Sequence, residues 1–375
     1  MCRKRPVGCR VSRSPAQYRI RLSDRERSNA MTSTTKIVSS PINHRPSEIL
    51  AYARTTAELG LRAAADSLPE PLLRMAGYHF GWWDVHGEPV PGRAGKLLRP
   101  GLAMGACMAC GGTPESATPA AVAAELIHNF TLIHDDVMDG DATRRGRPTV
   151  WAMWGLPAAV LLGDALHALA AEVLAARLPA VVVGPALDRL ESTVIELCRG
   201  QHEDCAAVHE RQPTIEDCER TAMGKTGALM GCACTLGALC AGADEATVTL
   251  MDRFGRELGL AFQLIDDLHG IWGDPTVSGK PAEDLARRKY TLPVVAALRS
   301  GTTAAAELNQ LYLRSDPLSS NEIAHAAKLI EAAGARGWTQ RQADQRIENA
   351  LRGLPAQLAS ADLEALARLV GHRNL

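Results

Sequence analysis

The sequence has 375 residues, with 41 Lys and Arg against 42 Asp and Glu, which gives a formal net charge of -1. This balance excludes the global basic field that characterises nucleic-acid or anionic-lipid binding proteins. Hydrophobic residues make up 46% of the chain and aromatic residues only 4%. Alanine and leucine recur throughout, so the composition favours a soluble protein built of helices.

We expect neither a membrane span nor a disulfide framework. The most apolar stretch, residues 156–187, is interrupted by Asp164, Glu172 and Arg177, so no transmembrane helix is predicted. The ten cysteines are scattered, as in a cytoplasmic protein with reduced thiols. Cys107 and Cys110 form one CxxC without a second pair at zinc spacing, which favours thiols packed in the core over a metal site.

The first 45 residues differ in composition from the rest. Residues 1–30 carry nine Lys and Arg against two Asp and Glu, without the apolar stretch of a secretory signal. Met31 is an equally plausible start, and residues 31–46 are rich in Ser, Thr, Pro and Asn. We predict a disordered arm over residues 1–45 and one catalytic domain over residues 46–375.

Beyond residue 46 the apolar spacing is helical almost throughout. Gly and Pro predict breaks at Gly87–Gly95, Gly111–Pro114, Gly146–Pro148, Gly184–Pro185 and Gly273–Pro281. The patch Val181–Val183 predicts a short connector or a helix end. From Asn321 onward we expect three amphipathic helices, so the predicted fold class is all-α.

The first candidate site is an acidic stripe on an apolar helix. His128, Asp135 and Asp139 are seven and four residues apart, and these spacings return to nearly the same helix face. Carboxylates at i and i+4 suit Mg²⁺, which prefers a few carboxylates together with phosphate oxygens and water. A solvated acidic helix end is the alternative interpretation.

Cations flank this stripe on both sides. Arg144 and Arg145 follow it, and Lys96 and Arg99 precede it at i and i+3. Arginines beside a metal site are suited to hold phosphate oxygens. A network of surface salt bridges is the alternative here.

A second acidic cluster repeats the pattern. Gln263, Asp266 and Asp267 stand at the end of another apolar segment, with Lys280 and Lys289 downstream. The pair Lys225-Thr226 lies between the two clusters. Two facing acid clusters among separated cations are what a helical bundle needs to hold Mg²⁺ and diphosphates in its core.

Taken in order, these motifs resemble the trans-isoprenyl diphosphate synthases of the polyprenyl synthetase family, particularly actinobacterial geranylgeranyl and farnesyl diphosphate synthases. The resemblance covers roughly residues 50–370: Gly95-Lys-Leu-Leu-Arg-Pro100, the Asp135-Asp-x-x-Asp139 motif with its Arg-Arg-Gly-x-Pro-Thr tail, the Lys225-Thr226 pair and Phe262-Gln-x-x-Asp-Asp267. It implies a large orthogonal helical bundle of the isoprenoid synthase type with a central active-site cavity, and a cytoplasmic homodimer. The implied reaction condenses isopentenyl diphosphate with an allylic diphosphate by ionisation, condensation and elimination.

The resemblance also implies a role for each motif residue. The implied catalytic residues are Asp135, Asp136, Asp139, Arg144, Lys225, Asp266 and Asp267. Three Mg²⁺ ions with bound diphosphate would be held by Asp135, Asp139, Asp266 and Asp267, with Asp136 in support. Isopentenyl diphosphate would be held by Lys96, Arg99, His128 and Arg145. The allylic diphosphate would be held by Arg144, Lys225, Thr226, Gln263, Lys280 and Lys289.

Product length is expected to depend on the residues four and five positions before the first motif, Thr131 and Phe130. In the family this combination resembles enzymes that make twenty-carbon geranylgeranyl diphosphate, with farnesyl and then geranyl diphosphate as alternatives. An ideal helix, however, places Phe130 about 140° around from Asp135. The second motif departs from many relatives, because Gly270 stands where they have a third Asp; Asp274 is eight residues after Asp266.

Other interpretations stay open. A class I terpene cyclase would share an aspartate-rich helix, but its usual Asn, Ser and Glu metal motif is missing from the sequence. A non-catalytic partner subunit is disfavoured by the nearly complete set of cations. His134 and His269 are expected to be satisfied histidines rather than general bases. The arm is either a tolerated disordered terminus or, as in some actinobacterial relatives, a docking tail for an encapsulin-type shell.

Overall fold

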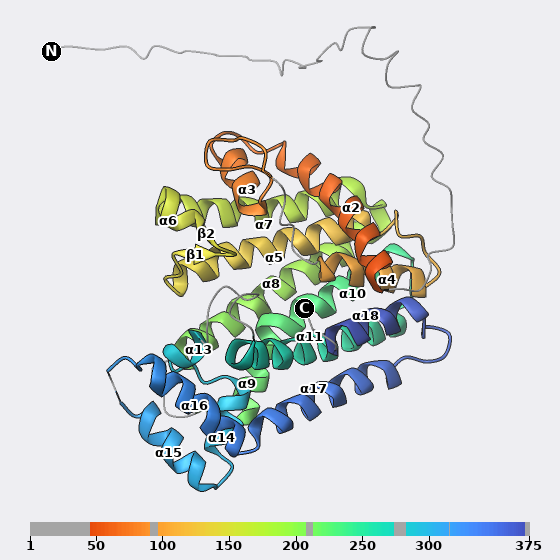
Figure 1. Ribbon diagram of the computed structural model, residues 1–375. Helices are drawn as coiled ribbons and strands as arrows, with labels where there is room; N and C mark the ends of the chain where they lie inside the picture. The colour runs from red at the N-terminus through yellow and green to blue at the C-terminus, as the bar shows by residue number, and fades with distance from the viewer. Residues whose placement is uncertain (1–45, 91–96, 208–212, 274–282, 315, 372–375) are drawn as a thin grey trace, which may run out of the picture. The chain divides into compact units, whose positions relative to one another are not determined.

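The computed structural model describes residues 46–90, 97–207, 213–273, 283–314 and 316–371. These belong to one compact unit, Asn43–Leu375, and nearly all of their regular structure is helical (Figure 1). The fold class is therefore all-α, as predicted. The domain boundary at residue 46 stays a prediction.

The first half of the unit supplies the helices around the first acidic stripe. In chain order they are α2 (Pro46–Ala65), α3 (Leu72–Phe80), α4 (Leu98–Ala109), α5 (Thr118–Met138), α6 (Val150–Trp154), α7 (Leu156–Arg177) and α8 (Ala180–Ala207). A two-strand hairpin of β1 (Thr143–Arg144) and β2 (Arg147–Pro148) lies between α5 and α6. The sequence did not predict these short strands.

The second half supplies the helices around the second cluster. They are α9 (Ile215–Ala222), the π-helical turn η1 (Met223–Gly227), α10 (Ala228–Cys240), α11 (Glu245–Trp272), α13 (Glu283–Ala286), α14 (Leu292–Leu298) and α15 (Thr303–Tyr312). The chain then forms α16 (Ser320–Ala332), α17 (Ala335–Arg352) and α18 (Ala361–Gly371). The last three confirm the helices expected after Asn321.

Helix α10 lies at the centre of the packing and is almost entirely buried. It packs against α4, α5, α8 and α11, and α17 runs along the other side of α11 (Figure 1). Glycines permit this close approach, because no side chain would fit at these positions. A Cβ added at Gly237 would stand 2.0 Å from Ala103 O, and one added at Gly255 would stand 2.4 Å from Met230 O. Close backbone contact therefore fixes how the central helices cross.

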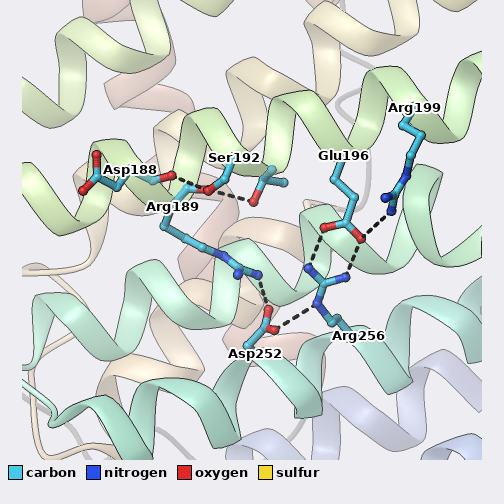
Figure 2. A network of polar contacts seen from close by, with 8 residues as sticks. Asp188, Arg189, Ser192, Glu196, Arg199, Asp252 and Arg256 are labelled. Carbon is cyan, nitrogen blue, oxygen red and sulfur yellow. Dashed lines mark hydrogen bonds and ion pairs between the residues drawn. The ribbon is translucent and has the colours of Figure 1, made fainter.

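A polar network joins α8 to α11 beside this core (Figure 2). Arg256 donates to both carboxylate oxygens of Glu196, at 2.8 and 2.7 Å, and its Nε donates to Asp252 at 2.9 Å. Arg189 of α8 donates to the other oxygen of Asp252. These charged groups are mostly removed from water, and Arg256 and Asp252 each have two partners of opposite charge. The network therefore ties the two helices together.

One expectation about α8 was wrong. The predicted break at Gly184–Pro185 does not occur: both residues, with Val181–Val183, lie inside α8. Pro185 lacks the N–H that would bond to the carbonyl of Val181, and the helix continues with that one hydrogen bond missing. The expectation of no transmembrane helix stays a prediction. Helix α7, with a mean hydropathy of 1.6, is long and apolar enough to cross a membrane, and 39% of its apolar window is buried. A core helix of a soluble protein passes the same test, and α7 packs against α5, α6 and α8.

Candidate active site

The last two turns of α5 hold the first acidic cluster at the edge of a cavity of about 410 Å³. Asp135 lines this cavity, and burial is the main cause that raises its pKa to about 6. Asp139 caps the helix with its N–H on Asp135 O at 2.8 Å. The two carboxylates therefore stand one turn apart, and the charge of Asp139 adds to the rise in the pKa of Asp135.

Asp136 faces a different partner. It is only 2% exposed, and one of its oxygens accepts from Nε and Nη2 of Arg144, at 2.8 and 2.7 Å. Arg144 lies on β1, and the hairpin turn after it has positive φ at Arg145 (52°) and Gly146 (76°), which matches the twist of the strands. The buried carboxylate thus positions Arg144, the first of the three arginines of the hairpin.

The second acidic cluster belongs to a hydrogen-bonded series that starts in η1. Thr226 donates to Gln263 Oε1 at 2.8 Å, and Gln263 Nε2 donates to Asp267 Oδ1 at 2.8 Å. The other oxygen of Asp267 accepts from Leu292 N at 3.1 Å. Burial is the main cause that raises the pKa of Asp267 to about 7. Asp267 is therefore held in place, whereas its neighbour Asp266 is exposed.

Both acids line a second cavity, of about 540 Å³, with Lys225 and Lys289. The two ammonium groups share one acceptor, Asp204 Oδ2, at 2.7 and 3.1 Å. Burial raises the pKa of Asp204, but the charges and hydrogen bonds of the two lysines outweigh it, and the net pKa is lowered. Sequence reasoning missed Asp204, because the run His202-Glu203-Asp204 looks like a solvated helix face.

Asp284 of α13 is a second residue that sequence reasoning missed. It lines the same cavity, and its charge contributes to the raised pKa of Asp267. A Cβ at Gly270 would stand 2.7 Å from Asp284 Oδ2. Asp284 therefore occupies the space into which a third acid of the α11 cluster would project. Asp274 lies outside the described residues.

A third group of predicted residues gathers around α4 and α5. The pKa of His128 is lowered well below its usual value, first by burial and then by the charge of Arg99, followed by that of Arg145. His128 is consequently neutral at physiological pH. The predicted partner Lys96 and the allylic-site Lys280 fall in the parts of the chain that the structure does not describe.

Phe130 and Thr131 line the 410 Å³ cavity together with Asp135. The Phe130 ring stacks on His167 of α7 with centroids 5.5 Å apart and meets His134 edge-on at 4.9 Å. His134 itself donates to Val160 O at 3.0 Å, as expected of a satisfied histidine. The 140° separation on an ideal helix thus does not keep Phe130 from the cavity that Asp135 lines.

The two cavities adjoin, because His202 and Lys225 line both. Within the described ranges, no three His, Cys, Asp or Glu side chains form a cage that could hold a metal ion alone. Small sets of carboxylates beside a cavity nevertheless fit Mg²⁺, which keeps water and phosphate oxygens among its ligands. Asp135, Asp139, Asp266 and Asp267 would hold it.

The comparisons with known proteins agree with this geometry. The family model for polyprenyl synthetase matches residues 88–330. The chain is 51% identical to geranylgeranyl diphosphate synthase of Mycobacterium tuberculosis, over 87% of this chain and 93% of that protein. It is 41% identical to (2E,6E)-farnesyl diphosphate synthase of Mycobacterium bovis, with the same two coverages. The polyprenyl synthetase structure from Streptomyces coelicolor A3(2) superposes with a TM-score of 0.82 at 43% identity, over 86% of this chain and 99% of that one. The chain therefore belongs to the polyprenyl synthetase family.

Proposed function

We propose that this chain is a Mg²⁺-dependent prenyltransferase that condenses isopentenyl diphosphate with allylic diphosphates. The observation that carries the proposal is the joining of two cavities at Lys225, one lined by acids and lysines and the other by Phe130 and Thr131. The first suits a diphosphate and the second suits the growing hydrocarbon chain. A separate cationic group around His128 and Arg99 favours a transferase with two diphosphate sites over a terpene cyclase.

The residues of the site perform three tasks in this reaction. Lys225, Lys289 and Arg144 bind the allylic diphosphate and neutralise its charge as it leaves. Thr226 and Gln263 keep Asp267 oriented toward the cavity. Bound Mg²⁺, proposed as three ions, supplies further charge neutralisation of the diphosphate. The apolar cavity holds the allylic carbocation away from water until the double bond of isopentenyl diphosphate attacks it, and a proton is then lost to the released diphosphate.

The proposed product is geranylgeranyl diphosphate. Support comes from the 51% identity to a geranylgeranyl diphosphate synthase and from the Phe130 ring, which is held between two histidine rings at the wall of the chain cavity. The shorter farnesyl diphosphate is the alternative, because a relative at 41% identity is a farnesyl diphosphate synthase.

The test uses the purified full chain, Mg²⁺ and labelled isopentenyl diphosphate, with dimethylallyl, geranyl and farnesyl diphosphates offered separately. Dephosphorylated products are separated by chromatography. A twenty-carbon alcohol supports both the transferase and the product. A fifteen-carbon alcohol keeps the mechanism and refutes the product, and a folded chain that condenses none of the three primers refutes the function. Diphosphate release from an allylic substrate alone would indicate a cyclase.

A homodimer is proposed for the working enzyme. Large exposed apolar side chains concentrate on the neighbouring helices α7 and α8, at Leu156, Leu161, Val181 and Ile195, which are 55 to 82% exposed. Large apolar side chains left exposed on adjacent helices are typical of an interface. Light scattering should give a dimer for the wild type, and a monomer for the double variant Leu161→Glu, Ile195→Glu. A wild-type monomer would refute the proposal.

The proposed location is the cytoplasm, consistent with the free thiols of all eight described cysteines. Residues 1–45 lie outside the described parts of the chain. The expectation of a disordered arm, with an encapsulin-type shell as one candidate partner, stays a prediction. Co-purification of the full chain with such a shell, and its loss without residues 1–45, would support it.

A further inference from the structure

The aromatic segment Tyr78–Trp83 ends α3 and contains one histidine that the proposed reaction does not use. Tyr78 donates to Pro148 O at 2.8 Å and Trp83 donates to Arg74 O at 2.9 Å, so both rings anchor the segment to its neighbours. His79 instead lines a cavity of about 380 Å³ with Arg144 and Arg145 of the hairpin. The cavity lining on that side therefore includes cations together with apolar side chains such as Leu132 and Val150.

His79 makes a hydrogen bond of defined direction to α5. Its Nε2 lies 3.1 Å from Asn129 Oδ1. The amide nitrogen of Asn129 is already engaged as a donor, to Glu125 O at 2.8 Å and to Glu125 Oε1 at 3.2 Å. The amide oxygen must then accept, so His79 carries its proton on Nε2. Burial, reinforced by Arg144 and Arg145, lowers the pKa of His79 to about 3 and keeps the ring neutral.

The series ends at a buried carboxylate, that of Glu125, which interacts with the charge of Arg99. Glu125 is 7% exposed and Asn129 is 4% exposed. The main influence on Glu125 is burial, which raises its pKa to about 7, and the charge of Arg99 is the largest opposing effect, followed by the Asn129 hydrogen bond. The same Arg99 charge acts on His128. Glu125 is thus the counter-charge of a cation that the proposed function assigns to isopentenyl diphosphate.

We propose that His79 is a positioning residue of the isopentenyl diphosphate site. Through Asn129 it fixes the orientation of the Glu125 carboxylate, and Glu125 in turn fixes Arg99. A buried polar series holds a single arrangement only while each member is satisfied. Loss of the His79 N–H leaves the Asn129 amide without its third bond and free to turn. The inference rests on the proposed function, because only there does Arg99 bind this substrate.

The test compares two substitutions of His79 in the full chain. His79→Phe keeps a ring and removes the donor, whereas His79→Gln keeps an N–H donor. Initial rates are measured with Mg²⁺, varying isopentenyl diphosphate at saturating farnesyl diphosphate and the reverse. We expect His79→Phe to raise the KM for isopentenyl diphosphate about threefold to tenfold, with the KM for farnesyl diphosphate unchanged. His79→Gln should restore most of the loss.

Two further variants separate positioning from stability. Asn129→Leu should raise the same KM, and adding His79→Phe to it should have no further effect, because both interrupt one series. The matched control is His325→Phe, which removes another paired histidine, at Glu307 on the C-terminal helices, and should change neither KM.

Distinct results would overturn the inference. An unchanged KM for isopentenyl diphosphate, or an equal rise in both KM values, refutes positioning of this site. Failure of both His79→Phe and His79→Gln to fold shows a structural role instead. A wild-type chain that performs no condensation refutes the proposed function, whereas an active wild type with an unaltered His79→Phe variant refutes this inference alone.

Discussion

Asp135 and Asp267 show how burial sets the chemistry of single residues in this protein. Removal from water is the largest cause of the raised pKa of each, and a neighbouring acid adds to it. Such groups are costly to ionise in the free protein. A bound divalent cation offsets that cost, so we expect these two proposed ligands to be stabilised by Mg²⁺.

Phe130→Ala should lengthen the product. The ring lines the chain cavity, is 8% exposed and is held by two histidine rings, so its removal extends the space available to the hydrocarbon. Chromatography of the dephosphorylated products should show the main product passing from twenty carbons to longer alcohols. Exposed Leu59→Ala is the control and should leave the distribution unchanged. An unaltered product from folded Phe130→Ala would contradict the assignment.

Glu125→Gln should change how stability depends on pH. The pKa of Glu125 in the folded chain is about 7, above its usual 4.5, mainly through burial. Its protonated form therefore contributes stability at low pH, and this is lost as pH rises through about 7. The neutral amide avoids this loss. The free energy of unfolding of the variant should therefore exceed that of the wild type by up to about 3 kcal/mol at pH 8 and by little at pH 5. Thermal unfolding at both pH values measures it.

The control for Glu125→Gln is Glu172→Gln, at an exposed position of α7. The difference in stability between this variant and the wild type should be the same at pH 5 and at pH 8. If Glu125→Gln gave an equal difference at pH 5 and pH 8, the raised pKa would be refuted.

Among the elements, the hairpin and the central helices position the site in different ways. The β1–β2 turn places Arg144 on Asp136 and leaves Arg145 in the left-handed region. The central helices act through close backbone contact. At Gly259, for example, an added Cβ would stand only 2.5 Å from the Cα atom of Gly227. That contact is directly beside Thr226, so helix packing places the start of the series that reaches Asp267.

Gly237→Ala and Gly184→Ala form a matched pair of helix substitutions. A Cβ at Gly237 would stand 2.0 Å from Ala103 O, so α4 and α10 must separate. We expect a loss of about 2 kcal/mol or more in the free energy of unfolding. A Cβ at Gly184 in α8 meets nothing within 4 Å, so alanine should add about 0.5–1 kcal/mol. Urea denaturation measures both, and equal effects of the two substitutions would contradict the packing argument.

At the scale of the whole molecule, α8 and α11 connect the site to the rest of the bundle. Helix α8 supplies Asp204 to the lysines and Leu197 to the chain cavity. The Arg256 network with Glu196 and Asp252 joins it to α11, which carries the second acidic cluster (Figure 2). The two segments that carry the proposed Mg²⁺ ligands are therefore part of a framework held by packing and by paired charges.

Removal of residues 1–45 should leave catalysis intact. Every residue that we assign to the site lies at position 79 or later. We expect kcat and both KM values of the truncated chain to stay within about twofold of the full chain, since none of the assigned residues is removed and chain termini generally tolerate truncation. The measurement is steady-state kinetics on both purified proteins. A large fall in turnover would show that the arm takes part in catalysis or folding.

The sequence alone determined the fold class and the family, and it predicted most residues of the candidate site. Helical spacing is a local property, and the acidic stripes of α5 and α11 follow from it directly. Side chains whose role depends on a partner far along the chain could not be found this way. Asp204 meets Lys289 across 85 positions, and Asp284 reaches the space beside Gly270. Only the tertiary structure decided these, because it alone brings distant side chains together.

The same reason explains the outcome at Phe130 and His79. An ideal helix turns Phe130 away from Asp135, but packing against α7 brings both to one cavity. His79 lies in the aromatic segment Tyr78–Trp83, and its bond to Asn129 spans 50 positions, which local sequence does not indicate. Local sequence thus determined which residues could do chemistry. The burial and pairing that set their charge and orientation were decided by the packing of helices distant in the chain.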